Sequence, residues 1–331
     1  MTAETRMRVV SADTLGPPEN YAIVETPLPT PGAGEILVRI RAVSLGYADA
    51  LLATGGYQVK PPLPFVPGTE AAGIVVAAGG DVAHVKAGDA VVVMRFGGCL
   101  ADHVLAKAGE VFPMPEGMSF EQASSYRSNY STAYHALKDR AALQPGETLL
   151  VLGAAGGVGT AAVQSGKRMG ARVIAGASSA AKRDFARAQG ADDVLDYSAE
   201  NWREPLKALT GGRGVDVIFD PVGGAVFEPA FRSLAWGGRH IVIGFAGGDG
   251  IPRLPANLPL LKGAGLLGAD IRQFYLKEPE KALANDAQIA RWCSEGLHPP
   301  VGTLFDFADY RAALTSASTG ASLGKIVVRV E

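Results

Sequence analysis

The sequence has only two cysteines, Cys99 and Cys293, among its 331 residues. This number is too small for a disulfide scaffold and indicates a reducing compartment. A basic excess is also missing, since 31 Lys and Arg stand against 33 Asp and Glu, which argues against nucleic acid or an anionic membrane as a partner. Neither an apolar run of membrane-spanning length nor the apolar core of a signal peptide is found. We therefore expect a cytoplasmic protein.

Glycine, in contrast, is abundant, with 42 residues that cluster in turns after short apolar runs. The clearest of these turns follows the apolar run Thr148–Leu152 and leads into small residues that can begin a helix. Ala154, Gly156 and Gly159 occupy the three positions of a G-x-G-x-x-G pattern, with alanine in place of the first glycine. A turn of this kind is typical of a nucleotide diphosphate site.

A helix that begins near Gly157 would direct its unpaired backbone N–H groups and its positive dipole end at a pyrophosphate. The residues expected around that group are Ala155, Gly156, Gly157 and Val158. Taken alone, the turn has an alternative interpretation, a tight strand-to-helix connection without a ligand. The elements around the turn are needed to choose between the two.

The chain changes its pattern near Ser119. Before it, short alternating segments such as Glu35–Ser44 are separated by turns rich in Pro and Gly, which favours a barrel-like antiparallel domain. After it, the capping box SFEQ opens a helix expected to run to about Ala142. Short apolar strands and amphipathic helices then alternate, which predicts a doubly wound parallel sheet. The strands expected in this sheet are Thr148–Leu152, Arg172–Ala175, Asp193–Leu195, Val215–Asp220 and His240–Gly244.

The last third of the chain contains an apolar segment, Leu260–Gly268, that could form a strand or strand pair at an open sheet edge. Such edges are usually covered, so we expect a homodimer, with cover by the chain's own loops as the alternative. A final strand, Lys325–Val330, would return to the first domain. The expected domains are therefore residues 1–125 with 268–331, and residues 126–267.

Several segments, in this order along the chain, resemble the medium-chain dehydrogenase/reductase superfamily and specifically its zinc-independent NADPH:quinone oxidoreductase (zeta-crystallin-like) branch. The segments are Val66–Val75, Tyr130–Leu137, the glycine-rich turn, the run that ends at Tyr197, and Gly324–Val328. The resemblance implies an α/β fold in which a GroES-like β-rich catalytic domain is joined to a Rossmann doubly wound parallel sheet.

The resemblance also shows where the alcohol dehydrogenases of the superfamily hold a catalytic zinc ion. The matching positions are Gly46, Thr69 and Ser128, which are not a competent set because zinc binds thiolate or imidazole groups. We therefore expect no metal. Without a Lewis acid the substrate should already accept hydride well, as quinones and α,β-unsaturated carbonyl compounds do.

The cofactor preference is predicted from the end of the second strand of the parallel sheet. An NAD site would have Asp or Glu there, whereas this chain has Ser178 and Ser179, with Lys182 one turn into the next helix. Hydroxyl and ammonium donors suit a 2′-phosphate, so we predict NADPH. The resemblance adds Tyr197 to this site, and Arg183 is a competing cation.

Other site residues follow from the resemblance alone, which puts the reacting ring in the cleft between the domains. Asn129 and Thr132 are expected near the carboxamide and ribose, although both could instead serve capping or packing. Gly244 and Phe245 lie on a loop expected to cover the ring. Lys325 is a further expected cofactor contact, with an ordinary lysine at the start of a strand as the alternative.

Tyr47 and Tyr57 are the residues expected to line the acceptor pocket and to act in catalysis, by stacking on a quinone or by donating to its oxygen. For Tyr57 the alternative is an aromatic side chain that packs in a loop beside Pro61 and Pro62. The predicted activity is NADPH-dependent reduction of a quinone or an activated double bond. The alternatives are a 2-enoyl-thioester or enone reductase, and an NADPH-binding protein with little turnover.

Overall fold

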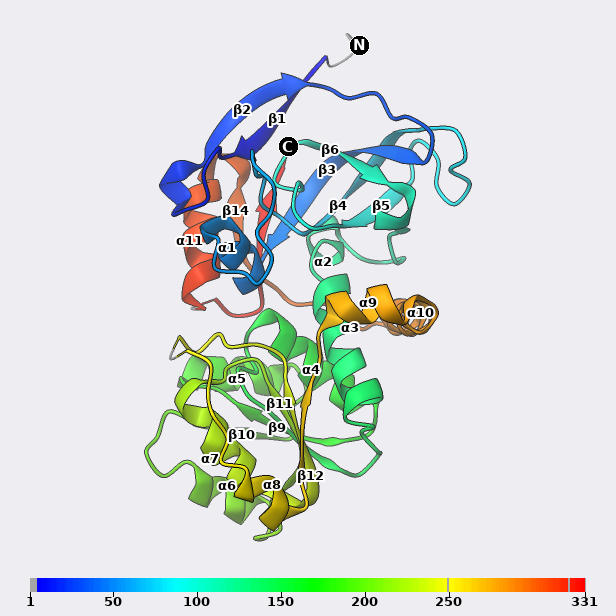
Figure 1. The fold of residues 1–331 in the computed structure, drawn as a ribbon. Helices are drawn as coiled ribbons and strands as arrows, with labels where there is room; N and C mark the ends of the chain where they lie inside the picture. The colour runs from blue at the N-terminus through cyan, green and yellow to red at the C-terminus, as the bar shows by residue number, and fades with distance from the viewer. Residues whose placement is uncertain (1–4, 249, 321, 331) are drawn as a thin grey trace. The chain divides into compact units, whose positions relative to one another are not determined.

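The computed structural model describes residues 5–248, 250–320 and 322–330. Residues 1–4 lie outside the described part; they begin the N-terminal segment in which the sequence has no apolar core of a signal peptide. Contacts divide the described residues into two compact units, unit 1 within Met1–Ser128 and Cys293–Glu331, and unit 2 within Asn129–Trp292 (Figure 1).

Unit 1 is built on a seven-stranded sheet with the order β14-β15-β3-β4-β5-β7, in which β6 also pairs with β3. Its strands are β3 (Glu35–Leu45), β4 (Glu70–Ala78), β5 (Ala90–Met94), β6 (His103–Lys107), β7 (Val111–Pro113), β14 (Val301–Asp306) and β15 (Lys325–Arg329). The strand β15 runs antiparallel to β3, so the C-terminal strand returns to the first part of the chain as predicted. A separate pair, β1 (Arg6–Ser11) and β2 (Ala22–Pro27), completes the strands of this unit.

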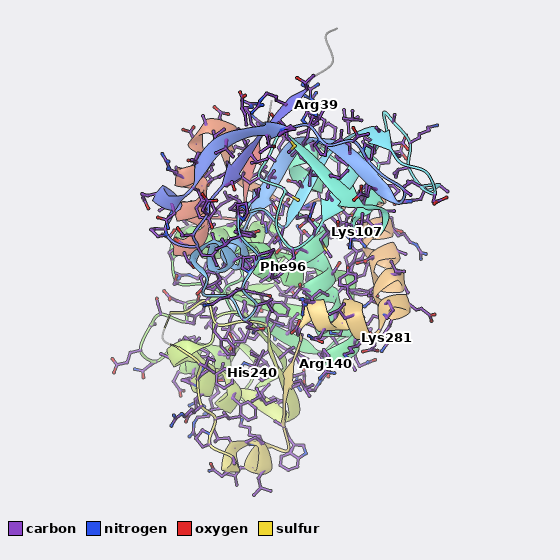
Figure 2. All side chains as sticks on the ribbon, turned by 45° about the horizontal axis from the view of Figure 1, so that its top comes forward. Arg39, Phe96, Lys107, Arg140, His240 and Lys281 are labelled. Carbon is purple, nitrogen blue, oxygen red and sulfur yellow. The ribbon has the colours of Figure 1, made fainter. Side chains whose placement is uncertain are left out.

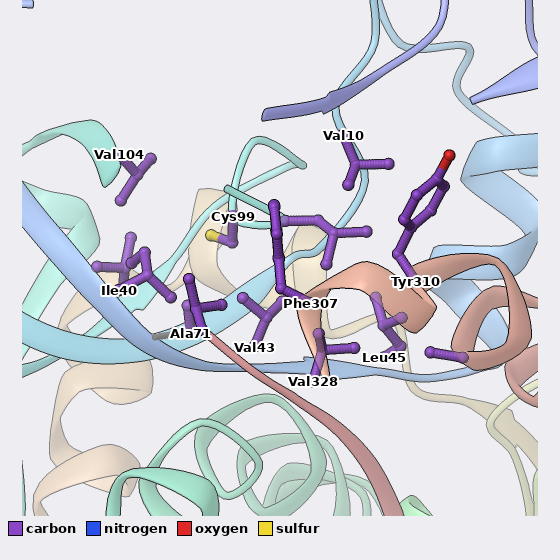
Figure 3. Packing of buried hydrophobic residues seen from close by; sticks show 14 of the residues in the cluster. Val10, Ile40, Val43, Leu45, Ala71, Cys99, Val104, Phe307, Tyr310 and Val328 are labelled. Atoms are coloured by element: carbon purple, nitrogen blue, oxygen red, sulfur yellow. The ribbon is translucent and has the colours of Figure 1, made fainter. Parts of the chain in front are cut away.

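The central strands of unit 1 bury side chains on both faces. Val43 and Leu45 of β3 pack into the main core with Val328 (Figure 3), and the helices α1 (Tyr47–Thr54) and α11 (Tyr310–Thr319) pack on each other. Successive residues of a strand point to opposite faces, so Ser44 faces away from this core. Glu70 lies opposite Ser44 in the register, and a polar group is therefore buried behind the sheet.

Unit 2 contains a six-stranded, all-parallel sheet with the order β10-β9-β8-β11-β12-β13. Its strands are β8 (Thr148–Val151), β9 (Arg172–Gly176), β10 (Asp193–Leu195), β11 (Val215–Asp220), β12 (Leu234–Val242) and β13 (Gly265–Gly268). The connecting helices include α4 (Gly157–Arg168), α5 (Ala180–Ala188), α6 (Arg203–Leu209) and α7 (Phe227–Arg232). The predicted doubly wound sheet is confirmed, although β12 begins at Leu234 and not at His240. The strand order reverses between β8 and β11, where such sheets bind ligands.

The prediction of a single helix from Ser119 to about Ala142 is wrong. The structure has α2 (Phe120–Ala123), α3 (Arg127–Tyr134) and a π-helical segment, η3 (His135–Arg140). After α2 the hydroxyl groups of Ser124 and Ser125 bond back to the carbonyl of Glu121, and the buried carboxylate of Glu70 accepts the first N–H groups of α3. These bonds satisfy backbone groups that a continuous helix would have paired internally.

The segment Leu260–Gly268 is only in part the expected edge strand. Its first half belongs to the helix α8 (Asn257–Lys262), which ends at Gly263 with φ of +55°. Only β13 is extended, and it does form one edge of the sheet. Residues 268–292 also differ from expectation, because they belong to unit 2 and not to the first domain.

The helices α9 (Ile271–Lys277) and α10 (Pro279–Ser294) hold this segment in unit 2. Asp286 accepts hydrogen bonds from Ser131 at 2.6 Å and from Tyr275 at 2.7 Å. The ring of His135 stacks on Phe274 with 3.8 Å between the centroids. The Ser131–Asp286 hydrogen bond and the His135–Phe274 stacking join residues far apart in the sequence, which explains why the sequence pattern did not reveal this boundary.

Candidate functional site

The glycine-rich turn of unit 2 has the geometry of an anion site. Gly153 adopts φ of +60° directly after β8, and α4 begins after Gly156, whose backbone is extended. A β-carbon on Gly159 would lie 2.2 Å from the Gly153 carbonyl oxygen, whereas one on Gly156 would meet no protein atom closer than 3.5 Å. Glycine at position 159 therefore allows the helix to pack on the turn, and position 156 leaves room for a ligand.

The start of α4 is partly exposed next to this space, although the Gly156 N–H donates to the Gly153 carbonyl at 3.1 Å. Gly156, Gly157 and Val158 are partly exposed, while Ala155 is buried and contributes its backbone to the turn. The first N–H groups of a helix have no partner within the helix and carry its positive dipole end. The turn therefore has the backbone features that a pyrophosphate would require, and the binding of one stays a prediction.

Loops from neighbouring strands meet at the same end of the sheet. The N–H of Ala154 donates to the Gly176 carbonyl at the end of β9 (3.0 Å). A β-carbon on Gly153 would lie 3.1 Å from Cγ2 of Val222, in the loop after β11. That loop is joined to the one after β12, because Gly247 N–H donates to the Val222 carbonyl (2.8 Å). The loops at the carboxyl ends of β8, β9, β11 and β12 therefore lie next to one another.

The predicted residues Gly244 and Phe245 lie in the loop after β12 and are partly exposed. The ring of Phe245 packs against Gly223, where a β-carbon would lie 3.0 Å from its Cδ1. Gly223 has φ of +65°, a conformation that favours glycine. The two loops therefore fit together only with a glycine at this position.

A buried pair, Asp220 and His240, supports the loop after β11. Asp220 Oδ2 lies 2.9 Å from His240 Nε2, and Oδ1 accepts the N–H groups of Val222 and Gly223 at 2.8 and 2.9 Å. Neither side chain reaches solvent, and His240 is labelled in Figure 2. Because both carboxylate oxygens of Asp220 have hydrogen-bond partners, Asp220 fixes the loop beside the glycine-rich turn. Sequence reasoning missed this pair, for which an acidic residue at a strand end was the only signal.

The residues predicted for a 2′-phosphate lie together at the ends of β9 and β10. Ser178 is exposed and Lys182 partly exposed, and Ser198 Oγ donates to the Ser178 carbonyl (3.3 Å). The ring of Tyr197 lies against Gly176, where a β-carbon would be 3.1 Å from its Cδ1. Burial, and secondarily the charges of nearby aspartates, raises the pKa of Tyr197, so its hydroxyl stays a hydrogen-bond donor.

Arg183, the competing cation, is engaged by the protein. Its guanidinium pairs with Asp196 at 2.8 Å and donates to the Ala177 carbonyl at 3.1 Å. Ser179 accepts the N–H of Lys182 and caps α5. The ion pair and the carbonyl contact make Arg183 less suited to binding a ligand.

Asn129 and Thr132 lie on α3 and are partly exposed. The buried residues between them fix this helix, since Ser131 donates to Asp286 and the Tyr130 hydroxyl donates to Gln164 of α4. The helix that carries both predicted residues is therefore tied to the helix that follows the glycine-rich turn.

Unit 1 holds a second cluster of functional groups, centred on Glu70. This side chain is fully buried and accepts the N–H groups of Arg127 at 2.7 Å and Ser128 at 3.2 Å. Burial raises its pKa to about 7, although the charge of Lys325 and the two N–H donors act in the opposite direction. An acidic residue at the start of an apolar strand was the signal that sequence reasoning overlooked.

The positions matched to zinc ligands lie in this cluster. Asp49, which is buried, accepts the N–H groups of Gly46 at 2.8 Å and Thr69 at 2.9 Å. Ser128 is joined to Glu70 as described above. Within the part of the chain that the structure describes, no three His, Cys, Asp or Glu side chains are placed to hold a metal ion. The donor chemistry of the three positions therefore does not fit zinc.

Lys325, predicted as a cofactor contact, is the first residue of β15 in unit 1 and only 9% exposed. A β-carbon on Gly46 would lie 3.0 Å from its Nζ. Tyr47 follows Gly46 at the start of α1 and is 36% exposed. Tyr57 packs on the core of unit 1 and tilts toward Phe96, with 6.0 Å between ring centroids. Phe96, an exposed aromatic (Figure 2), was not predicted.

Known proteins resemble this chain along most of its length. Residues 32–116 match the alcohol dehydrogenase GroES-like domain, and residues 157–285 match the zinc-binding dehydrogenase family. Quinone oxidoreductase-like protein 2 of Rattus norvegicus is 36% identical over 302 residues, which are 91% of this chain and 86% of that protein. The chain belongs to the quinone oxidoreductase branch of the medium-chain dehydrogenase/reductase superfamily.

Two solved structures extend the comparison of this quinone oxidoreductase-like chain. A probable oxidoreductase from Mycobacterium abscessus has a TM-score of 0.89 at 35% identity, covering 98% of this chain and 99% of the other. The quinone oxidoreductase of Thermus thermophilus, studied also in complex with NADPH, has a TM-score of 0.85 at 33% identity, covering 98% and 100%.

These relationships confirm the α/β fold with a GroES-like and a Rossmann part. The chain is an oxidoreductase of the quinone oxidoreductase type. None of the helices formed by the described residues combines the length and apolar character that crossing a membrane requires.

Proposed function

We propose that this protein uses NADPH to reduce a quinone or an activated carbon–carbon double bond, without a metal ion. The observation that carries the proposal is the set of donors at the end of β9. Ser178 and Lys182 lie where an NAD site would have a carboxylate, and the nearby Asp196 is held by Arg183. The complex of the Thermus thermophilus relative with NADPH supports the choice of cofactor.

In this proposal the residues of unit 2 bind and orient the cofactor. Ala155, Gly157 and Val158 hold the pyrophosphate through backbone N–H groups, and Gly156, whose N–H donates to the Gly153 carbonyl at 3.1 Å, leaves room for it. Ser178, Lys182 and Tyr197 hold the adenosine phosphate. Asn129, Thr132, Gly244 and Phe245 are proposed to orient the nicotinamide. The bound cofactor would supply a hydride ion, which carries both electrons of the reduction.

The proposed acceptor residues belong to unit 1. Tyr47 and Tyr57 present phenol rings that can stack on a flat quinone or donate to its oxygen. Gly46, Thr69 and Ser128 offer no thiolate or imidazole, which supports reduction without zinc. An acceptor that needs no Lewis acid, such as a quinone or an enone, fits this chemistry.

We also propose a homodimer that forms through β13. This edge strand exposes Leu266, and the neighbouring apolar side chains Trp236, Leu260 and Leu261 are 80%, 78% and 67% exposed. An unpaired strand edge beside exposed apolar side chains is a suitable surface for a second copy of the chain. The proposed cytoplasmic location rests on the low cysteine content.

The activity can be tested by following NADPH oxidation with a panel of acceptors: 1,4-benzoquinone, an enone and an enoyl-CoA. We expect turnover with the quinone or the enone, and no loss of activity after exhaustive treatment with a zinc chelator. Turnover only with the enoyl-CoA would favour the thioester reductase. Tight NADPH binding without turnover of any acceptor would favour a binding protein and refute the proposed activity.

A further inference from the structure

Lys325 is a largely buried cation of unit 1. Its side chain is 9% exposed, and its ammonium nitrogen is not among the buried polar atoms that lack a partner in the described part of the chain. An ammonium group has three donors, and removing them from water without partners is costly. The ammonium therefore keeps access to solvent on a side chain that is otherwise buried, and an anionic group that enters from solvent can accept from it.

Glu70 is an opposite charge that interacts with Lys325. Glu70 attracts Lys325, but the Glu70 oxygens accept the N–H groups of Arg127 and Ser128. The two Glu70 oxygens are therefore engaged by backbone N–H groups, although Glu70 still interacts electrostatically with Lys325. The positive charge remains available for a second anionic group.

The position in front of the ammonium has no side chain. Gly46 has φ of −142°, which any residue can adopt, so the backbone does not require glycine there. A β-carbon at this position would approach the Lys325 Nζ to 3.0 Å. Glycine thus leaves the ammonium uncovered at the residue directly before Tyr47.

A buried polar group without a partner lies on the same face of the sheet. Ser44 is fully buried, and its hydroxyl has no hydrogen-bond partner among the described residues. Ser44 precedes Gly46 by two residues and is opposite Glu70 in the register, so the three share one face. A buried hydroxyl without a partner and the ammonium of a largely buried lysine therefore mark the same polar face.

We propose that the Lys325 ammonium binds the acceptor oxygen that becomes negatively charged during reduction. This inference rests on the proposed function and assigns Lys325 to the acceptor instead of the cofactor. When hydride bonds to one carbonyl oxygen of a quinone, the π electrons shift through the ring, which becomes aromatic, and the opposite carbonyl oxygen becomes a phenolate. Lys325 stabilises that charge without giving up its proton, and a proton from water completes the hydroquinone. Fixed donors act strongly on such an oxygen because they are already oriented.

The test compares Lys325→Met with Lys107→Met, a matched change of an exposed lysine on β6 of the same unit (Figure 2). Three quantities are measured on the full chain: NADPH affinity, kcat with 1,4-benzoquinone, and the affinities for 4-nitrophenolate and the uncharged nitrobenzene at one pH. The phenolate carries the charge that develops in the reaction, so its binding reports on Lys325 without turnover.

For Lys325→Met we expect kcat to fall about 100-fold and phenolate affinity to fall about 10-fold or more. Affinities for nitrobenzene and NADPH should stay within about threefold of wild type, and Lys107→Met should change none of these values. Loss of NADPH affinity with unchanged phenolate binding would overturn the inference and assign Lys325 to the cofactor. Unchanged turnover and phenolate binding would also overturn it.

The inference and the proposed function can fail separately. A wild-type protein that turns over no acceptor, but loses phenolate binding in Lys325→Met, would refute the activity and retain the anion site. If Lys325→Met does not fold, because Glu70 is left buried without a cation, the double variant with Glu70→Gln removes that charge. Gly46→Ala keeps the charges of Glu70 and Lys325 and places a methyl group next to the ammonium. This variant should bind the phenolate more weakly than the wild type and keep its melting temperature. Unchanged phenolate affinity would count against the inference.

Discussion

A β-carbon on Gly159 would lie 2.2 Å from the carbonyl oxygen of Gly153, a distance that real side chains do not adopt. The contact joins the first turn of α4 to the end of β8, and it sets where the N–H groups of that turn point. Only glycine at position 159 allows helix and turn to approach this closely. The third position of the fingerprint is thus explained by packing within the protein.

Gly159→Ala should therefore move α4 away from the turn. We expect a loss of about 1–3 kcal/mol in the free energy of unfolding, as found for overpacked interiors, together with weaker NADPH binding. Urea denaturation and calorimetric titration measure the two effects. Gly109→Ala is the control, because a β-carbon there meets nothing within 4 Å. Equal behaviour of the two variants would contradict this explanation of the turn.

Lys182 should decide between NADPH and NADH. Lys182→Ala removes one charge-assisted hydrogen bond to a 2′-phosphate, so the NADPH dissociation constant should rise about 10- to 150-fold while that for NADH stays constant. Arg187→Ala, at the other end of α5 and paired with Asp184, is the matched control. If Lys182→Ala binds NADPH like the wild type, the cation must be sought elsewhere, first at Arg183.

Glu70 should make stability depend on pH. Its pKa is raised from 4.5 to about 7 in the folded protein, so its contribution to folding is fully present below about pH 4.5 and is lost as the pH rises to about 7. Relative to Glu70→Gln, the wild type should lose up to about 3 kcal/mol of unfolding free energy over that range. Urea denaturation at several pH values measures this difference. Parallel curves for the two proteins would show that Glu70 does not titrate in this range, and Glu19→Gln, at an exposed position, controls for the loss of a carboxylate.

The edge strand β13 should carry the dimer. Leu266, 41% exposed, becomes charged in Leu266→Glu, which should give a monomer in sedimentation or light-scattering measurements because a charge on the edge blocks pairing. Leu304→Glu changes a residue of similar exposure, 40%, on the edge strand β14 of the other sheet and should leave the dimer intact. A monomer produced only by the second change would assign the interface to unit 1.

The parallel sheet was predictable because each strand is a short apolar run followed by a turn and an amphipathic helix. Glu70 was not predictable as a cap, because it lies 57 residues before the Arg127 N–H that it accepts. The same holds for Lys325, whose neighbour Gly46 comes from the opposite end of the chain. Local patterns predict the elements and the glycine-rich turn, whereas the polar contacts depend on which strands become neighbours.

The ion pair between Arg183 and Asp196 bears on the choice between NADPH and NADH. Ser198 links Asp196 to Ser178, with its hydroxyl 2.5 Å from the aspartate and 3.3 Å from the Ser178 carbonyl. A carboxylate therefore already stands beside the proposed phosphate position, with its charge neutralised by one arginine. Loss of Arg183 would release an acceptor for ribose hydroxyls and a charge that repels phosphate. Replacement of Arg183 alone would then shift the preference of the protein toward the unphosphorylated dinucleotide.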